Sequence, residues 1–176
     1  MQDFITSFSA FSDQEKLVKE YQKGRLVDDR LKNEDYVVAV LKGKVSVYNE
    51  NGVLLTVLKK GECYGVSNLL VGSSLSTKLA VIEDSSLMFI KKDTFRAKLK
   101  TDLALSNAYN LYLSQKVDFL LKRISLLTLQ SSHDRVKAFL EMEDVQFNTK
   151  EEIASYLGIS RSQYFKAISA LKTEEK

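Results

Sequence analysis

Five residues in the C-terminal quarter of the chain carry groups suited to recognising nucleic acid: Ser160, Arg161, Ser162, Gln163 and Lys166. An arginine guanidinium forms paired hydrogen bonds with guanine, the commonest specific contact in the DNA major groove. A lysine ammonium suits a phosphate, and a residue that opens a helix can offer its backbone amide to a phosphate as well. These groups donate hydrogen bonds and positive charge, so the chemistry they suit is the binding of DNA.

Two short amphipathic helices joined by a turn at Gly158 would position these groups. Thr149 and Glu152 form an S/T-x-x-E capping box at the start of the first helix, and Ser160 and Gln163 repeat it at the start of the second. This layout is typical of a helix-turn-helix, whose second helix enters the major groove. An ordinary helical hairpin within a core is the alternative. The predicted inward residues are Ile153, Ala154, Leu157, Tyr164, Ile168 and Leu171, and the predicted outward residues of the second helix are Arg161, Ser162, Phe165, Lys166 and Ser169.

Charge is distributed unevenly along the chain, whose formal net charge is +3. Residues 1–90 hold 11 Lys/Arg and 12 Asp/Glu, residues 91–130 hold 8 and 3, and residues 131–176 hold 7 and 8. The segment expected to bind DNA is therefore not basic overall. Because phosphate neutralisation dominates affinity for DNA, this balance predicts modest affinity.

Composition also restricts the class of protein. The chain has 176 residues, 44% of them hydrophobic and 28% charged, as in a globular protein with one or two cores. No run approaches the roughly 18 apolar residues of a membrane span, and the N-terminus does not resemble a signal peptide. We therefore expect a cytoplasmic protein.

The inventory of reactive side chains is small, with one cysteine, Cys63, and one histidine, His133. A metal site of the cupin type needs several histidines in the β region, which has none, and neither a glycine-rich phosphate loop nor a nucleophile–base pair is evident. We expect no enzymatic activity, no metal and no cofactor. Cys63 is expected to pack partly buried, and His133 is expected to be a surface or capping residue.

The first 90 residues have the character of an all-β domain. Short β-rich runs alternate with glycines spaced about ten residues apart, which we interpret as turns, and Asn51-Gly52 is a hairpin signal. Phe11–Tyr21 is predicted to be a short amphipathic helix. The predicted strands are Tyr36–Leu41, Val45–Tyr48, Val53–Leu58, Leu79–Ile82 and Leu87–Ile90.

Beyond about Lys92 the pattern is helical, and the segment Asn110–Leu127 has heptad spacing. β-Branched residues at position a with leucine at position d favour a parallel two-stranded coiled coil, and an asparagine at a fixes its register. A long helix buried on two sides in a monomer is the alternative. A second stripe, Leu105, Tyr112, Phe119 and Leu126, would pack against the β domain. Arg135–Met142 is a further predicted helix, after a polar break at 130–133 that would serve as a hinge. The predicted dimerisation residues are Asn110, Leu113, Val117, Leu120, Ile124 and Leu127.

The order of these elements resembles the cyclic-AMP receptor protein/fumarate–nitrate regulator (Crp/Fnr) family of bacterial transcription factors over roughly residues 10–172. The resemblance rests on YVVAVLKGKVSVY (36–48), LKKGECYG (58–65) and IASYLGISR (153–161). It implies an α+β fold: a cyclic-nucleotide-binding-type β-roll (jelly roll) sensor domain at 1–92, a dimerisation helix region at 93–130, and a helix-turn-helix domain at 131–176. A two-stranded wing usually follows the second helix in this family, and the sequence stops a few residues beyond that helix, so we expect either that the wing is absent or that the sequence is part of a longer chain.

The departures from the family pattern concern the ligand. Val66 stands where cyclic-nucleotide-binding members have the glutamate that holds the ribose, and Leu75 and Ser76 stand where they have an Arg-Ser pair on the phosphate. Leu120 and Leu121 replace polar residues that reach the base. Because a buried phosphate needs charged or well-placed donors, cyclic AMP is not the expected ligand, and the input is unknown.

The resemblance implies a homodimeric regulator that binds a two-fold symmetric site on double-stranded DNA, with RNA polymerase as a further candidate partner. The alternative is a dimeric sensor or adaptor that acts through protein–protein contacts and retains a vestigial DNA-binding domain.

Overall fold

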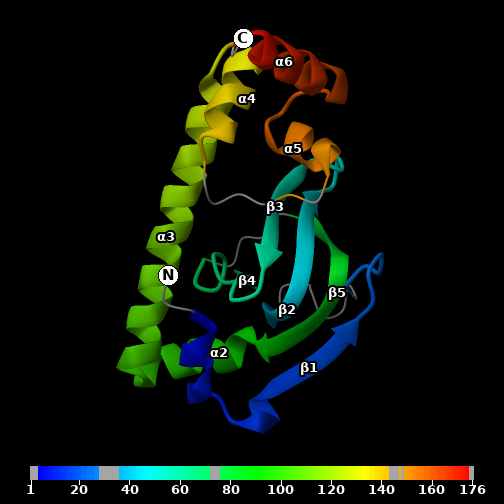
Figure 1. Cartoon of the computed structure of the whole chain (residues 1–176). Helices are drawn as coiled ribbons and strands as arrows, with labels where there is room; N and C mark the ends of the chain where they lie inside the picture. Colours follow the sequence, from blue (N-terminus) through cyan, green and yellow to red (C-terminus); the bar gives the residue numbers. More distant parts are fainter. Residues whose placement is uncertain (1–3, 28–35, 72–75, 143–146, 148, 175–176) are drawn as a thin grey trace. The chain divides into compact units, whose positions relative to one another are not determined.

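The computed structural model describes residues 4–27, 36–71, 76–142, 147 and 149–174 (Figure 1). The chain forms two compact units, Met1–Ser114 and Gln115–Lys176. The first combines an antiparallel sheet with helices and the described part of the second is helical, so the fold is α+β, as predicted. Among the described residues, no helix is both long and apolar enough to cross a membrane.

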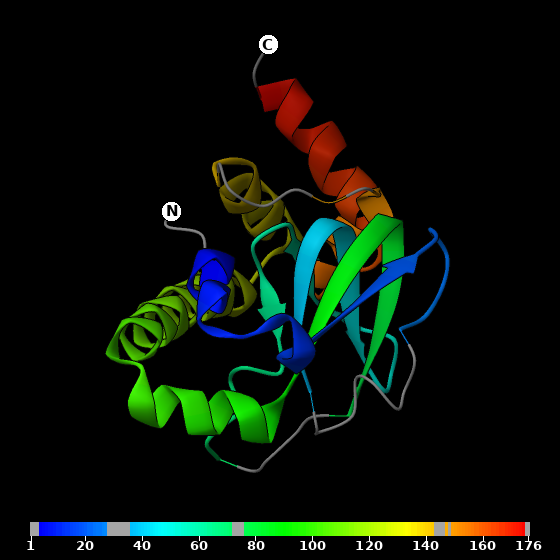
Figure 2. The ribbon, with the colours of Figure 1, turned by 90° about the horizontal axis from the view of Figure 1, so that it is seen from below.

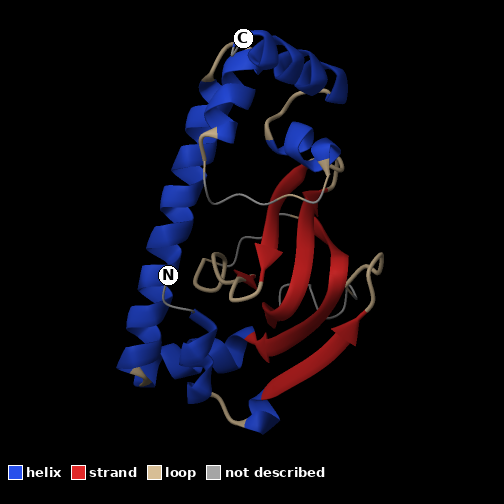
Figure 3. Ribbon diagram, viewed as in Figure 1, coloured by secondary structure: helices blue, strands red, loops and turns tan. Residues whose placement is uncertain are grey.

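A 5-stranded antiparallel sheet forms the centre of the N-terminal unit (Figure 3). Its spatial order is β1-β5-β2-β3, and β4 pairs with β2. The predicted turn at Asn51-Gly52 is present, since β2 and β3 pair on either side of it and the Asn49 amide donates to the carbonyl of Val53 at 3.0 Å. The prediction of a β-rich N-terminal part is therefore confirmed. The strands are β1 (Lys16–Tyr21), β2 (Tyr36–Asn49), β3 (Leu54–Lys59), β4 (Cys63–Tyr64) and β5 (Thr77–Lys91).

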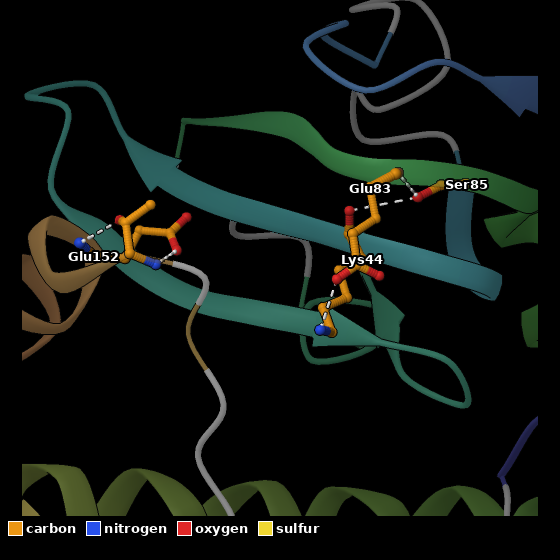
Figure 4. Close-up of polar contacts among 5 residues, drawn as sticks. Lys44, Glu83, Ser85 and Glu152 are labelled. Carbon is orange, nitrogen blue, oxygen red and sulfur yellow. Dashed lines mark hydrogen bonds and ion pairs between the residues drawn. The ribbon is translucent and has the colours of Figure 1, made fainter.

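Two long strands replace four of the predicted short ones. The runs before and after Gly43 are one strand, β2, and Leu79–Ile82 and Leu87–Ile90 both belong to β5. The prediction that Gly43 marks a turn is wrong, because its φ of +84° instead allows a bulge where the pairing of β2 with β5 shifts register. Beside the bulge, Lys44 Nζ lies 2.7 Å from Glu83 Oε1 and the Ser85 hydroxyl donates to the carbonyl of Glu83 at 2.6 Å (Figure 4).

The two faces of the sheet carry separate apolar clusters. Successive side chains of a strand point to opposite faces, so Val37 and Ala39 belong to one cluster, and Val38 and Val40 belong to the other. The first cluster continues into the helices of the N-terminal unit. The second is made mainly of β-branched and leucine side chains from β2, β3 and β5: Val45, Val47, Leu58, Leu79, Val81 and Leu87.

The predicted helix at Phe11–Tyr21 is wrong. The chain forms two 3₁₀ helices, η1 (Phe4–Ala10) and η2 (Asp13–Glu15), and Lys16–Tyr21 then pairs with β5 as the edge strand β1. The residues of β1 do not alternate between buried and exposed as those of a half-buried strand would, because the inner four are all exposed at the edge of the sheet. Their sequence therefore did not indicate a strand. The helix η1 lies beside α2 and the start of α3 (Figures 1 and 2), where Phe4 stacks on Tyr112 with ring centroids 4.6 Å apart.

The helix α2 (Lys92–Thr101) leads into α3 (Leu103–Thr128), which contributes residues to both units. Asp102 separates the two helices, and its carboxylate accepts a hydrogen bond from the Leu105 amide at 2.9 Å. Leu105 and Tyr112 join the core of the N-terminal unit. That part of the second predicted stripe is confirmed.

The C-terminal unit combines the second half of α3 with α4 (Ser132–Leu140), α5 (Lys150–Tyr156) and α6 (Arg161–Glu174). Phe119, Phe139 and Phe147 surround Tyr156, with ring centroids 6.3, 6.2 and 4.9 Å from it. Phe119 therefore packs within this unit, and the prediction that it covers the β domain is wrong. The helix α4 begins at Ser132 rather than Arg135, since Ser131 Oγ accepts a hydrogen bond from the Asp134 amide at 3.0 Å.

Candidate nucleic-acid interface

Both predicted capping boxes are formed. In α5 the Glu152 amide donates to Thr149 Oγ1 at 3.1 Å, and the Thr149 amide donates to the Glu152 carboxylate, labelled in Figure 4, at 3.2 Å. In α6 the Gln163 amide donates to Ser160 Oγ at 3.2 Å, and the Ser160 amide donates to Gln163 Oε1 at 2.8 Å. These bonds satisfy amides that a helix start leaves unpaired, so they fix where each helix begins.

The turn between α5 and α6 depends on Gly158. Its φ is +64°, a conformation that ends many helices and that L residues rarely adopt. A Cβ at this position would lie 3.3 Å from Leu127 Cδ2, so the approach of α3 also favours the absence of a side chain. The predicted pair of helices joined at Gly158 is thus present.

One side of α6 is buried and the other is exposed. Tyr164 and Ala167 are buried, while Ile168 and Leu171 are half-buried. Ala167 was absent from the predicted inward set because alanine adds little to a hydrophobic pattern. The exposed side lines a shallow open hollow formed by the five residues predicted to face outward: Arg161, Ser162, Phe165, Lys166 and Ser169.

The predicted site residues fall into two groups. Arg161, Ser162 and Lys166 come together in the hollow with free access to solvent. Ser160 and Gln163 are exposed but bind each other as the cap, so their side chains are already used. Arg161 Nε also lies 2.9 Å from the Glu151 carboxylate, and its guanidinium carbon is 5.5 Å from the Phe165 ring centroid. A base or phosphate would compete with Glu151 for this arginine.

Two other arginines hold the turn in place and were missed at the sequence level. Arg123, from α3, donates to the carbonyl of Tyr156 at 3.1 and 3.3 Å, and its guanidinium carbon lies 4.3 Å from the Tyr156 ring centroid. Arg135, from α4, donates to the carbonyl of Leu157 at 3.3 Å and to that of Leu129 at 2.8 Å. Both place positive charge at the C-terminal end of α5, where the helix dipole favours it.

Burial shifts the pKa of both Arg123 and Tyr156. Burial lowers the pKa of the Arg123 guanidinium, and Tyr156 acts in the opposite sense. Burial likewise raises the pKa of Tyr156, against the effect of Arg123. A signal for this pair was available, because Arg123 follows Phe119 by four residues and therefore lies on the buried stripe of α3. A charged residue on a buried stripe needs a partner.

The six predicted dimerisation residues divide in the same way between exposed and internal positions. Val117, Leu120 and Ile124 are 55%, 52% and 54% exposed, and Asn110 is exposed as well. Leu113 instead packs against the core of the N-terminal unit, and Leu127 is half-buried. Val117, Leu120 and Ile124 form an exposed apolar stripe on α3, to which Leu121, 58% exposed, adds a neighbouring side chain.

Val66 and Ser76, two of the positions that depart from the family's nucleotide-binding pattern, lie between β4 and β5. Val66 is buried, and its carbonyl accepts a hydrogen bond from the Tyr109 hydroxyl at 3.1 Å. Lys92, also buried, donates to Asn68 Oδ1 at 3.0 Å. Ser76 is exposed. The prediction for Leu75 lies outside the described residues.

Cys63 is buried in the core of the N-terminal unit, and its backbone is tied to α3. The Cys63 amide donates to the Tyr112 hydroxyl at 2.8 Å, and that hydroxyl donates to the Cys63 carbonyl at 3.1 Å. Burial, with the nearby Cys63 and Glu62, raises the pKa of Tyr112.

The one histidine of the sequence, His133, has a side chain that is 30% exposed. Its ring nitrogens lie 3.5 Å from the carboxylate of Asp134 and 3.2 Å from that of Glu174.

Comparison with known families identifies the N-terminal part. Residues 13–102, just over half of the chain, match the family model of the cyclic nucleotide-binding domain. The chain belongs to the cyclic nucleotide-binding domain family. Its sheet is accordingly of the type found in that family, although membership does not specify the ligand. No curated protein matches the sequence significantly.

Solved structures show a similar fold over nearly the whole chain. CLP, the c-di-GMP responsive global regulator of Xanthomonas campestris, is 18% identical with a TM-score of 0.73, and the alignment covers 98% of this chain and 92% of CLP. FixK2 of Bradyrhizobium japonicum is 20% identical with a TM-score of 0.70, covering 91% and 86%. A CooA variant of Carboxydothermus hydrogenoformans is 17% identical with a TM-score of 0.75, covering 98% and 85%. At these identities the likeness concerns the fold alone.

Proposed function

We propose that this protein is a transcription regulator of the Crp/Fnr family that binds double-stranded DNA as a homodimer. The observation that carries the proposal is the exposed side of α6, where Arg161, Ser162 and Lys166 surround an open hollow while the opposite side is buried. In this role α5 and α6 are the helix-turn-helix, and α6 enters the major groove. Arg161 binds a guanine, Lys166 binds a phosphate, and the capped start of α6 at Ser160 faces the backbone.

The fold of CLP, described as a c-di-GMP responsive global regulator that links signalling to virulence gene expression, supports regulation as the general role. Cyclic AMP is not the proposed input, because Val66 offers no carboxylate for a ribose. We assign the sensor role to residues 1–92, dimerisation to 93–130 and DNA binding to 131–176. We propose no enzymatic activity for this protein. RNA polymerase is a candidate partner, and a cytoplasmic location is a prediction.

The dimer rests on the exposed apolar stripe of α3, which two chains would cover in a parallel pair. Replacing Leu120 with glutamate should weaken association, because a charge would replace an apolar side chain in the interface. Leu111→Glu is the matched control, since Leu111 is 47% exposed on the same helix but lies outside the heptad stripe. Sedimentation equilibrium should detect monomers for Leu120→Glu only. Equal association of both variants would place the interface elsewhere.

DNA binding is tested by selecting duplexes from a random pool with the full chain, at low and near-physiological salt. We expect enrichment of a two-fold symmetric site. Arg161→Ala should lose selection at one base pair of each half-site. Lys166→Ala should weaken binding to all duplexes and reduce the salt slope by about 2, since the dimer carries two copies of this lysine. Lys137→Ala, which removes an exposed positive charge of α4 outside the hollow, should retain the selected sequence.

A dimeric adaptor with a vestigial DNA-binding domain is the second candidate. It is favoured by the balance of 7 basic and 8 acidic residues over 131–176, and by the ion pair that occupies Arg161. Salt separates the two functions, because contacts with phosphates make affinity fall steeply as salt rises. Binding to duplexes that does not respond to salt, or no enrichment at either concentration, would favour the adaptor.

A further inference from the structure

Phe165 is an aromatic side chain at the centre of an otherwise polar surface. It is 37% exposed and lines the hollow together with Arg161, Ser162, Lys166 and Ser169. The buried residues of α6 are Tyr164 and Ala167, so the core of the unit is filled from the other side of the helix. The ring therefore lies on the exposed side of α6 and presents about a third of its surface to solvent.

Two cations hold this ring from different helices. The Arg161 guanidinium carbon and Lys150 Nζ each lie 5.5 Å from its centroid, the first from α6 and the second from the first turn of α5. The Tyr164 ring meets it edge-on, with centroids 5.7 Å apart. These contacts restrict the orientation of the ring, and the surrounding positive charges would attract a polyanion to it.

The flanking positions leave room around the ring. Ser162 and Ser169 lie three residues before and four residues after Phe165, on the same side of the helix, and both have small side chains. A partner surface can therefore approach the ring from the side of these two serines. In a DNA major groove, the apolar group that is presented among the base edges is the 5-methyl of thymine, and phenylalanine is one of the side chains that contact it.

We infer that Phe165 determines sequence specificity by contacting the 5-methyl group of a thymine one or two base pairs from the guanine bound by Arg161. The inference rests on the proposed DNA binding and adds one element of the recognised sequence. Its spacing follows from the helix, since four residues rise about 6 Å at 1.5 Å each. Base pairs are about 3.4 Å apart along the duplex, so this rise corresponds to one or two steps.

The experiment uses the full chain and the symmetric duplex that it selects. Each thymine of a half-site is replaced in turn, in both half-sites together, by deoxyuridine, which lacks only the methyl group. Loss of one buried methyl contact weakens binding about fourfold, which corresponds to about 0.8 kcal/mol, and two half-sites together weaken it about fifteenfold. At one thymine position we expect this loss for the unmodified protein.

Phe165→Ser should bind the thymine and deoxyuridine duplexes with the same dissociation constant, because it has no ring to contact the methyl group. Phe165→Leu should retain part of the preference. Lys166→Ala is the matched control: it should bind both duplexes more weakly and keep the ratio between them. Far-UV circular dichroism of each variant checks that α6 remains folded.

The outcomes separate this inference from the function on which it rests. If the full chain selects no duplex, both are overturned. If it selects a duplex but deoxyuridine has no effect at any position, DNA binding stands and the role of Phe165 is wrong. The same conclusion follows if Phe165→Ser discriminates as strongly as the unmodified protein, or if the selected half-site has no thymine within two base pairs of the guanine lost in Arg161→Ala.

Discussion

Replacing Arg123 with methionine should destabilise the C-terminal unit without altering any residue of the exposed hollow. Methionine keeps an unbranched apolar stem that can cover the same part of α3, but it lacks the guanidinium. The variant therefore loses both hydrogen bonds to the carbonyl of Tyr156 and the contact with the Tyr156 ring. The carbonyl concerned is at the end of α5, where helices leave acceptors unpaired.

The size of the effect can be worked out from these contacts. Hydrogen bonding from a charged donor contributes about 1.5–3 kcal/mol, and the two bonds share one acceptor, so we count them once. A half-buried cation over a ring adds about 1 kcal/mol. Removing a charge from a half-buried site recovers some desolvation energy, which lowers the total. We expect the free energy of unfolding to fall by about 2–3 kcal/mol.

Urea unfolding followed by far-UV circular dichroism measures this change, since the chain has no tryptophan to report by fluorescence. With a urea slope of about 1–3 kcal/mol per molar, the midpoint should drop by about 0.7–3 M. Hydrogen exchange of amides in α5 and α6 assigns the loss to the C-terminal unit. Lys122→Met is the control, because Lys122 is the preceding residue and its exposed ion pair with Asp118 contributes about 0.5 kcal/mol or less. If Arg123→Met is no less stable than Lys122→Met, the role assigned to Arg123 is refuted.

Three further changes test other parts of the structure. Tyr112→Phe removes the hydroxyl that bonds both backbone groups of Cys63, and should lower the free energy of unfolding by about 1–3 kcal/mol in urea titrations. Burial raises the pKa of Tyr112 above its ordinary value of 10.0, so the neutral hydroxyl stabilises the fold below pH 10. The free energy of unfolding should decline above that pH, and it should decline less in Tyr112→Phe, which has no hydroxyl to ionise. Gly43→Ala combines a positive φ with a clash against the neighbouring strand and should lower the free energy of unfolding by about 2–5 kcal/mol. In Gly52→Ala the added Cβ meets nothing within 4 Å, so the loss should be only about 1–2 kcal/mol. Equal thermal stability of the two variants would contradict the bulge. Ser160→Ala removes the cap of α6 and should cost about 1 kcal/mol, seen as weaker amide protection in the first turn of that helix; unchanged protection would mean that the cap is not needed.

Features encoded by neighbouring residues were predictable from the sequence. The two capping boxes, the turn at Gly158 and the exposed side of α6 all depend on side chains within one or two helical turns of each other. The hairpin at Asn51-Gly52 is local in the same sense. For these elements the relevant contacts are short in sequence, so the pattern of residue types was enough to locate them.

Features that depend on distant partners were not predictable in the same way. The continuity of β2 across Gly43 is set by its pairing with β5, about 40 residues further along the chain. Lys16–Tyr21 is a strand because β5 supplies the hydrogen bonds, although its own residues show no alternation. Leu105 and Tyr112 of the second predicted stripe pack in the core of the N-terminal unit, whereas Phe119 of the same stripe packs in the C-terminal unit. One heptad pattern therefore contributes to two different cores. For Arg123 the spacing from Phe119 indicated that the side chain needs a partner, but not that the partner is a carbonyl of α5.

The two tyrosine hydroxyls of α3 have a consequence for how this protein can change during evolution. Tyr109 and Tyr112 bond to the main chain of Val66 and Cys63 rather than to their side chains. Any residue that fits the space at positions 63 and 66 would supply the same carbonyl groups. Substitutions at these two positions can therefore accumulate while the attachment of this segment to the helix is inherited unchanged.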